Sequence, residues 1–175
     1  MSRPVREKTR PPKRGRLLDN RGAVYVEFLA SFFPVFISFW CLLQSAGLYA
    51  AKLVVRNSAY LGARAAAVVI PDDPKRYGGA KGVSGKRKAA IESAVRQGLA
   101  GNRSLINWMA VIKTKGGNGQ EKTDFNRDEV VRVSVHVPYK CRLPIADKVV
   151  CGFLGWRYLD AEANMVVHGA DYEYP

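Results

Sequence analysis

A glycine and a glutamate near the N-terminus are the residues whose types and spacing best indicate chemistry. Gly22 ends a basic stretch, and Glu27 follows five positions later in an otherwise uncharged apolar run. If a peptidase cuts after Gly22, the new α-amine lies on Ala23, one helical turn from the Glu27 carboxylate. In an array of parallel helices this carboxylate can pair with the amine of a neighbouring chain. Only one axial stagger then satisfies both charges away from water.

A simpler interpretation of Glu27 stays open. An isolated carboxylate inside a membrane costs several kcal/mol unless it is paired or lies near the interface. Glu27 at the level of the headgroups, close to the positive end of a helix dipole, meets that condition in any single-pass protein. The residue types alone do not decide between the two interpretations.

The apolar run around Glu27 is long enough to cross a membrane. The 24 residues 28–51 carry no charge. As a helix they extend about 36 Å, more than a hydrocarbon core of about 30 Å. Basic residues before the run and few just after it predict a cytoplasmic N-terminus, with the bulk of the chain outside. A buried core helix and a cleaved secretory signal peptide are the alternatives. The remaining chain is small to surround such a helix, and the run exceeds the usual apolar region of a signal peptide.

The junction resembles a known family. Gly22 followed by Ala23-Val24-Tyr25-Val26-Glu27 looks like the cleavage site of class III (type IV-like) prepilins. Residues 21–68 more specifically resemble the TadE-like pseudopilins of tight-adherence pilus systems. The residues that carry this resemblance, beyond the junction itself, are Phe28, Pro34, Gly47-Leu48-Tyr49, Asn57 and Gly62-Ala63-Arg64-Ala65-Ala66.

The resemblance implies a function and a site of action. A prepilin peptidase would trim the chain after Gly22, at the cytoplasmic face of a bacterial inner membrane. The product would be a minor pilin or pseudopilin of a Flp-type pilus, with other pilins and the pilus assembly platform as partners. Residues 1–22 would be a basic cytoplasmic leader, 23–51 the transmembrane part of a helix, 52–70 its extracytoplasmic extension and 71–175 a small α+β periplasmic domain. The alternative is a single-pass, membrane-anchored extracytoplasmic binding protein that is not processed.

Periodicity beyond the apolar run predicts two helices. Apolar residues recur every three to four positions up to Val68, so the first helix should continue until Pro71 ends it. The first half of this helix would lie in lipid, and the second half would offer an apolar stripe to the domain. A short second helix is expected over residues 86–99, with an inner face made of Ala89, Ala90, Ile91, Ala94, Val95 and Leu99.

Three stretches later in the chain predict strands. Residues 131–137 and 159–167 alternate apolar and polar side chains, the pattern of half-buried strands. Residues 105–114 form a plausible first strand, separated from the second by a Gly-rich turn at 116–119. About three antiparallel strands packed on the long helix give an α+β fold of pilin-like layout.

A second block of positive charge follows the long helix. Residues 75–88 hold no acid and six basic residues, namely Lys75, Arg76, Lys81, Lys86, Arg87 and Lys88. A phosphate-binding loop does not fit, because Ala80 replaces the first glycine and Arg87 replaces the hydroxyl residue that would hold magnesium. A flexible solvated loop and a basic contact loop for an acidic partner or anionic lipid headgroups both remain.

The cysteines predict one disulfide. Cys141 and Cys151 would be joined outside the cytoplasm, closing a small loop worth roughly 2–3 kcal/mol on the chain-entropy model. Two reduced, buried thiols are the alternative. The pair lacks further Cys or His residues at zinc spacing, so no metal site is expected. Cys41 is expected to be a packing residue of the membrane span.

No catalytic constellation is recognisable. The two histidines, His136 and His168, have no Ser or Cys in a known nucleophile motif. We therefore expect neither an enzyme nor a cofactor nor a small-molecule substrate.

A net charge of +13 by itself suggests nucleic acid as a partner, but the distribution of that charge along the chain argues against one. Residues 1–21 hold eight basic and two acidic residues, a net +6, and residues 75–88 contribute another +6. The rest of the chain is nearly neutral. We therefore interpret residues 1–21 as a basic leader that sets the orientation of the chain in the membrane, and no nucleic-acid partner is expected.

Overall fold

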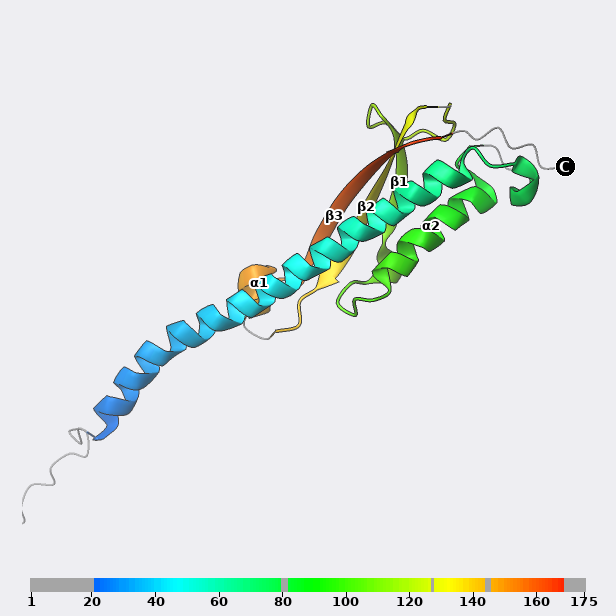
Figure 1. Ribbon diagram of the computed structural model, residues 1–175. Coiled ribbons are helices and arrows are strands. Elements are labelled where there is room, and N and C mark those ends of the chain that lie inside the picture. Colours follow the sequence, from blue (N-terminus) through cyan, green and yellow to red (C-terminus); the bar gives the residue numbers. More distant parts are fainter. Residues whose placement is uncertain (1–20, 80–81, 127, 144–145, 169–175) are drawn as a thin grey trace, which may run out of the picture. The chain divides into compact units, whose positions relative to one another are not determined.

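The computed structural model describes residues 21–79, 82–126, 128–143 and 146–168 (Figure 1). The helices are α1 (Arg21–Val69), α2 (Gly85–Leu99) and α3 (Ala146–Val150), with short 3-10 helices η2 (Pro74–Tyr77) and η3 (Asn107–Met109). The strands are β1 (Val111–Gly116), β2 (Val130–Lys140) and β3 (Trp156–Val166). The chain divides into two compact units, residues 1–36 and 37–175. Most of the predicted leader, residues 1–20, lies outside the described residues.

The first unit contributes the beginning of α1. Every described side chain from Gly22 to Phe36 is exposed, although most of them are apolar. The segment Gly22–Val69 is long and apolar enough to cross a membrane, with a mean hydropathy of 1.9 over its most apolar window, and none of that window is buried. A helix that exposes apolar side chains all round needs an apolar environment. The helix can therefore serve as a membrane anchor.

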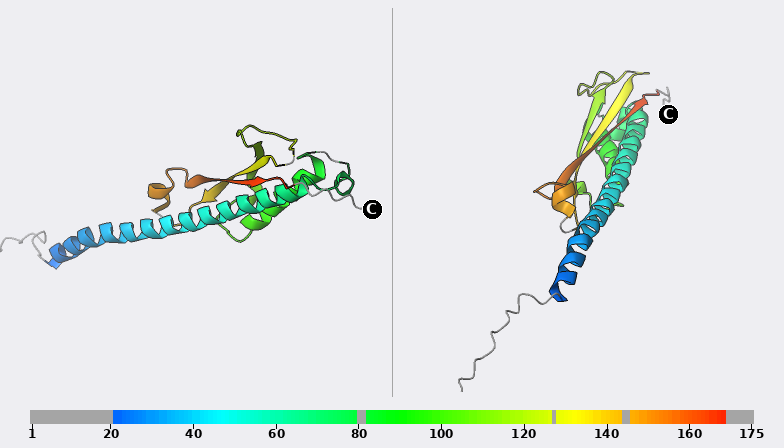
Figure 2. Two further views of the ribbon diagram at one scale, coloured as in Figure 1. Left: turned by 45° about the horizontal axis from the view of Figure 1, so that its top comes forward. Right: turned by 90° about the vertical axis from the view of Figure 1, so that its left-hand side faces the viewer.

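The second unit buries one face of α1. The covered face begins at Gln44 and continues to the end of the helix, through Ala51, Val55, Ser58, Ala59, Ala63 and Ala66. Small residues let α2 approach closely. A Cβ atom on Gly98 of α2 would lie 2.8 Å from Oγ of Ser58. Figures 1 and 2 show α2 alongside the later part of α1. The predicted amphipathic extension of the first helix is confirmed, and it ends at Val69, just before Pro71.

A three-stranded antiparallel sheet packs on these helices in the order β1-β2-β3. The central strand pairs Val135 with Ile112 on one side and with Ala161 on the other. Its inward residues, Val131, Val133, Val135 and Val137, are fully buried. They meet Ile91, Val95 and Leu99 of α2 in one core. The long helix with a small antiparallel sheet confirms the predicted α+β fold.

Two predictions of local structure were wrong. Residues 105–110 do not belong to the first strand, which begins only at Val111. Leu105 makes an isolated bridge to Tyr139, and the chain then turns through η3, capped by the amide of Ala110 on the Asn107 carbonyl. Ala89 is exposed rather than inward, because the buried row of α2 runs through every fourth residue from position 87.

Candidate functional site

The predicted processing junction lies in the first turns of α1. Gly22, Ala23, Glu27 and Phe28 all fall in this helix, so the Gly22–Ala23 peptide bond is part of its first turn. A Cβ atom on Gly22 would meet nothing within 4 Å. Ala23, Glu27 and Phe28 are exposed. Within the described part of the chain, Glu27 makes no hydrogen bond or ion pair that would neutralise its carboxylate.

An aromatic row begins at this junction. The rings of Phe28 and Phe32 stack with centroids 5.5 Å apart, and Phe32 stacks on Phe36 at the same distance. The spacing of four residues places the three rings on one side of the helix. They are all exposed within their unit. The row offers a rigid apolar ridge that a neighbouring helix or lipid chains could cover.

The six basic residues predicted to form a contact loop are not all exposed to solvent. Arg87 is only 3% exposed, so its assignment to a contact surface was wrong. Its guanidinium lies over the Tyr77 ring, 5.4 Å from the ring centroid, and donates to the backbone carbonyl of Asp72. Arg87 falls in the buried row of α2 because it lies four residues before Ile91. It therefore fastens the start of α2 to the segment that follows α1, at Asp72 and at Tyr77 of η2.

The other cations of this block differ in their surroundings. Lys88 pairs with Glu92 at 4.0 Å, and Arg76 pairs with Asp72 at 3.8 Å. Lys75 is the second residue of η2, and its amide donates to the Asp73 carboxylate over 2.9 Å. Lys75 and Lys86 are exposed, and Lys81 lies outside the described residues. Partial burial, with a hydrogen bond to Asp72, raises the pKa of the Tyr77 hydroxyl.

The segment is also fixed to the sheet side of the domain. Gly82 adopts φ +60°, and a Cβ atom there would lie 2.4 Å from the carbonyl oxygen of Thr123. The amide of Val83 donates to the same carbonyl over 2.6 Å. Only glycine fits this approach. The alternative of a wholly flexible loop therefore does not describe residues 82–88.

Cys141 and Cys151 form a disulfide with Cα atoms 6.6 Å apart. The bridge closes a loop that contains α3. At the start of this helix the amide of Asp147 donates to the carbonyl of Leu143, and at its end the amide of Cys151 donates to the carbonyl of Asp147. Gly152 and Gly155 adopt φ of +78° and +65°, which turn the chain back into β3. Cys41 is a free, half-buried thiol.

An exposed apolar cluster beside this disulfide was not identified from the sequence. Its members, which we call the apolar tip, are Val149, Phe153, Leu154, Trp156 and Tyr158. Phe153 is 93% exposed and Leu154 is 81% exposed. Large apolar side chains gathered this way in a folded domain indicate an interaction surface. The signal available in the sequence was the position of Phe153 and Leu154 between two glycines, which indicates a turn.

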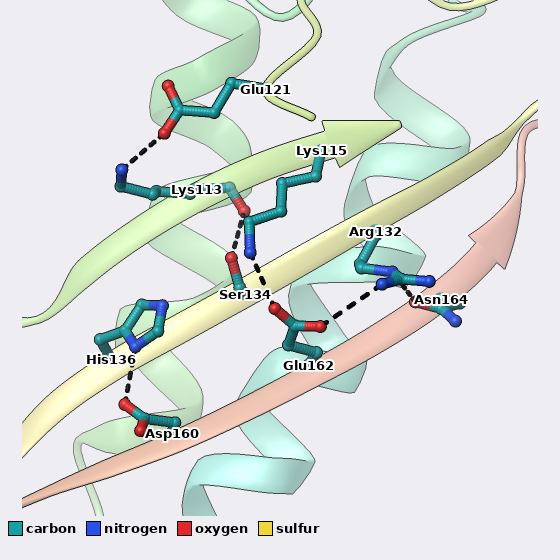
Figure 3. A network of polar contacts seen from close by, with 9 residues as sticks. All are labelled: Lys113, Lys115, Glu121, Arg132, Ser134, His136, Asp160, Glu162 and Asn164. Carbon is teal, nitrogen blue, oxygen red and sulfur yellow. Dashed lines mark hydrogen bonds and ion pairs between the residues drawn. The ribbon is translucent and has the colours of Figure 1, made fainter. Parts of the chain in front are cut away.

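The outer face of the sheet carries a polar network (Figure 3). Lys115 donates to Glu162 over 2.9 Å, and Arg132 lies 3.7 Å from the same carboxylate. The Lys115 hydrogen bond holds the pKa of Glu162 below its usual value. His136 and Asp160 are directly paired across β2 and β3, and Nδ1 of His136 lies 2.6 Å from Oδ1 of Asp160. These cross-strand pairs satisfy one another, as a solvated sheet face requires.

One open groove lies between α2 and the β1 edge of the sheet. It has a volume of about 640 Å³ and is lined by Lys88, Ile91, Glu92, the start of β1 and residues 121–124. Its lining carries three cations, Lys88, Lys113 and Lys122, and three acids, Glu92, Glu121 and Asp124, so neither sign of ligand is favoured. Among the described residues no cluster of His, Cys, Asp and Glu could hold a metal ion.

Comparisons with protein-family models, with curated proteins and with solved structures find no match to this chain.

Proposed function

We propose that the chain is a TadE-like minor pilin or pseudopilin of a Flp-type, tight-adherence pilus. The first part of α1 anchors it in the bacterial inner membrane, and a prepilin peptidase trims it after Gly22. The mature chain then associates with other pilins and with the assembly platform. The small α+β domain projects from the membrane on the side opposite the peptidase.

The observation that carries this proposal is Glu27 on the bare part of α1. A single carboxylate sits among exposed apolar side chains and has no partner within the described residues. Placed in lipid, that charge requires compensation from another molecule. An N-terminal amine on Ala23 of a neighbouring chain supplies it, one helical turn away along the helix axis.

The arrangement of the domain supports the same conclusion. Half of α1 is covered by α2 and the sheet, while the other half is uncovered. A subunit built this way can assemble through its bare helix and leave the domain unchanged. The aromatic row at Phe28, Phe32 and Phe36 gives the helix a shaped surface for packing against neighbours.

The test is the identity of the mature N-terminus. Mass spectrometry of the protein from membranes with active prepilin peptidase should find Ala23 as the first residue. Gly22→Leu should leave the leader attached, while the domain stays folded, because a side chain at Gly22 meets nothing within 4 Å. Gly101→Leu is the matched control, since Gly101 also has no neighbour within 4 Å, and it should be processed normally. An intact leader on the unmodified chain would contradict the proposal and favour the unprocessed, membrane-anchored binding protein.

A further inference from the structure

We propose that the apolar tip is a second membrane contact, inserted into the headgroup region of the leaflet where α1 leaves the bilayer. This inference rests on the proposed membrane anchoring by α1 and names a site beyond it. The occupant is the surface of an anionic bilayer. The disulfide between Cys141 and Cys151 would hold the tip in the shape that reaches it.

The tip lies at the end of the domain where α1 first becomes covered. Gln44 is the first residue of α1 that the domain buries, at 3% exposure, and its Oε1 accepts a hydrogen bond from the amide of Leu143 over 3.3 Å. A Cβ atom on Gly47 would lie 3.2 Å from the hydroxyl of Tyr139. Figures 1 and 2 both show α3 beside this part of α1. The disulfide loop is therefore level with the residues around Gln44.

A membrane span that begins at Ala23 would end at this level rather than at residue 51, because the domain itself buries Ala51. From Ala23 to Leu43 there are 21 residues, which rise about 32 Å along a helix. A hydrocarbon core is about 30 Å thick. Within the second unit the preceding residues Phe39, Leu42 and Leu43 are exposed and apolar. The outer boundary of the hydrocarbon core then falls close to Gln44, where the disulfide loop lies.

The composition of the tip is that of an interfacial segment. Trp and Tyr concentrate at membrane–water interfaces, where the ring is apolar on one side and can donate a hydrogen bond on the other. Trp156 and Tyr158 are exposed on β3, and Phe153 and Leu154 precede them in the turn. Trp156 is paired with Lys140, the last residue of β2, so the aromatic residues stand at the end of the sheet.

The charge around the tip complements anionic headgroups. Residues 140–158 carry a single acid, Asp147, and four cations, all exposed, namely Lys140, Arg142, Lys148 and Arg157. Arg142 donates to the carbonyl of Arg103, which brings a fifth cation to the same end. Basic residues close to an anionic surface each add about 1 kcal/mol of attraction. A surface made of exposed aromatics ringed by cations fits lipid better than it fits an acidic or a purely apolar protein.

The experiment measures how deep single tryptophans lie in a bilayer. The full chain is reconstituted into vesicles of phosphatidylethanolamine and phosphatidylglycerol that contain lipids brominated near the headgroup or near the chain end. One variant keeps only Trp156 (Trp40→Phe with Trp108→Phe), and a second keeps only Trp40. A third carries Asn118→Trp in place of all three, at the β1–β2 turn on the other end of the sheet.

The expected result is that lipids brominated near the headgroup quench Trp156 about twofold or more beyond the Asn118→Trp control. Both brominated lipids should quench Trp40, which lies about 6 Å along the helix inside the boundary near Gln44. If Trp40 is quenched and Trp156 equals the control, the tip does not touch lipid and the inference is wrong, although the anchor stands. If Trp40 also escapes quenching, the anchor itself fails. Shielding of Trp156 that depends on protein concentration and not on brominated lipid would assign the tip to a second copy of the chain and overturn the lipid assignment.

Discussion

Gly62 of α1 and Val95 of α2 are so close that a Cβ atom on Gly62 would lie 2.4 Å from Cγ2 of Val95. The same atom would lie 3.2 Å from Cγ1 of Val133 on the central strand. The helices α1 and α2 and the strand β2 therefore meet at a position with no side chain. This contact sets how near α2 can lie to the long helix, and so how the sheet is held on it.

Gly62→Ala should destabilise the domain. Forcing a methyl group into a filled core costs about 1–3 kcal/mol, which the better helix propensity of alanine offsets by about 1 kcal/mol. The thermal midpoint of the full chain in detergent, followed by circular dichroism, should fall by a few degrees.

Val95→Ala removes the obstructing atom and serves as the partner in a double-mutant cycle. Gly62→Ala combined with Val95→Ala should be less destabilised than the sum of the two single changes, because the added methyl then has room. Additive effects would show that the close approach does not set the stability of this contact.

The close approach could not have been predicted from the sequence. The periodic apolar residues of α1 predicted which face is buried, and the structure confirms that face from Ala51 to Ala66. Alternation predicted β2 and β3 for the same physical reason, since successive residues of a strand face opposite sides. Gly62 has no side chain and therefore does not contribute to the apolar periodicity. Its neighbours on α2 and β2 come from distant parts of the chain, so local patterns do not predict them.

The errors at Arg87 and at residues 105–110 have different causes. Charge suggested that Arg87 is solvated, yet its spacing of four from Ile91 places it on the buried face of α2. Position outweighs residue type there because an aromatic ring and a backbone carbonyl are available to hold the buried guanidinium. Leu105 and Trp108 have strand-like side chains, but they sit in a bridge and a 3-10 turn that only the pairing with β2 determines. The apolar tip escaped prediction because Phe153 and Leu154 are core residues by type.

Arg87→Ala should weaken the domain where Lys86→Ala does not. Losing the guanidinium leaves the Asp72 carbonyl without that donor and removes the contact with Tyr77, a loss of about 1–3 kcal/mol. Lys86 is exposed, and a surface change of that kind stays within about 0.5 kcal/mol. The two variants remove the same charge, so thermal midpoints compared side by side separate a structural role from a contact role. Equal effects on stability would contradict the structural assignment of Arg87.

The cysteine chemistry makes a counting prediction. The oxidised protein, unfolded in denaturant, should react with one thiol reagent per chain, at Cys41, and with three after reduction. Replacing both Cys141 and Cys151 by Ala should lower the stability by roughly 2–3 kcal/mol on the chain-entropy model. Reduction of the unmodified protein should lower its thermal midpoint to about that of the Cys141→Ala, Cys151→Ala variant, whereas Cys41→Ala should leave the midpoint of the oxidised protein unchanged. Three reactive thiols before reduction would exclude the disulfide.

Glu162 predicts a pH dependence with a definite sign. Its pKa is lowered in the folded chain, first by the hydrogen bond from Lys115, so the ionised form is favoured by folding. The resulting stability is present above the unfolded pKa of about 4.3 and is lost as the pH falls through the lower folded value. The unmodified chain should therefore melt above Glu162→Gln near neutral pH, and the difference should vanish in acid. The effect should be small and weakened by salt, because the pair is partly exposed.

Glu92→Gln is the control for that measurement. Glu92 is 4.0 Å from Lys88 in a looser pair on α2. Its replacement removes another carboxylate paired with a lysine, so the comparison tests whether the pH-dependent difference belongs to the Lys115–Glu162 pair. A difference between the unmodified chain and Glu162→Gln that grows toward acid would reverse the assigned sign.

Glu27→Gln should separate processing from assembly. Glutamine keeps the shape of the side chain but cannot neutralise an amine. Glu27 is exposed and has no hydrogen bond or ion pair within the described residues, so the folded domain and its melting should not change. Cleavage after Gly22 should continue, giving Ala23 as the first residue by mass spectrometry. Removing one partner of an ion pair buried away from water costs about 3–5 kcal/mol, so recovery of the subunit in sheared pili or in the assembly complex should fall by more than about tenfold. Glu27→Asp keeps the charge on a shorter arm and should recover part of the loss. Normal assembly of Glu27→Gln would show that the carboxylate only sits at the headgroup level, as in any single-pass protein.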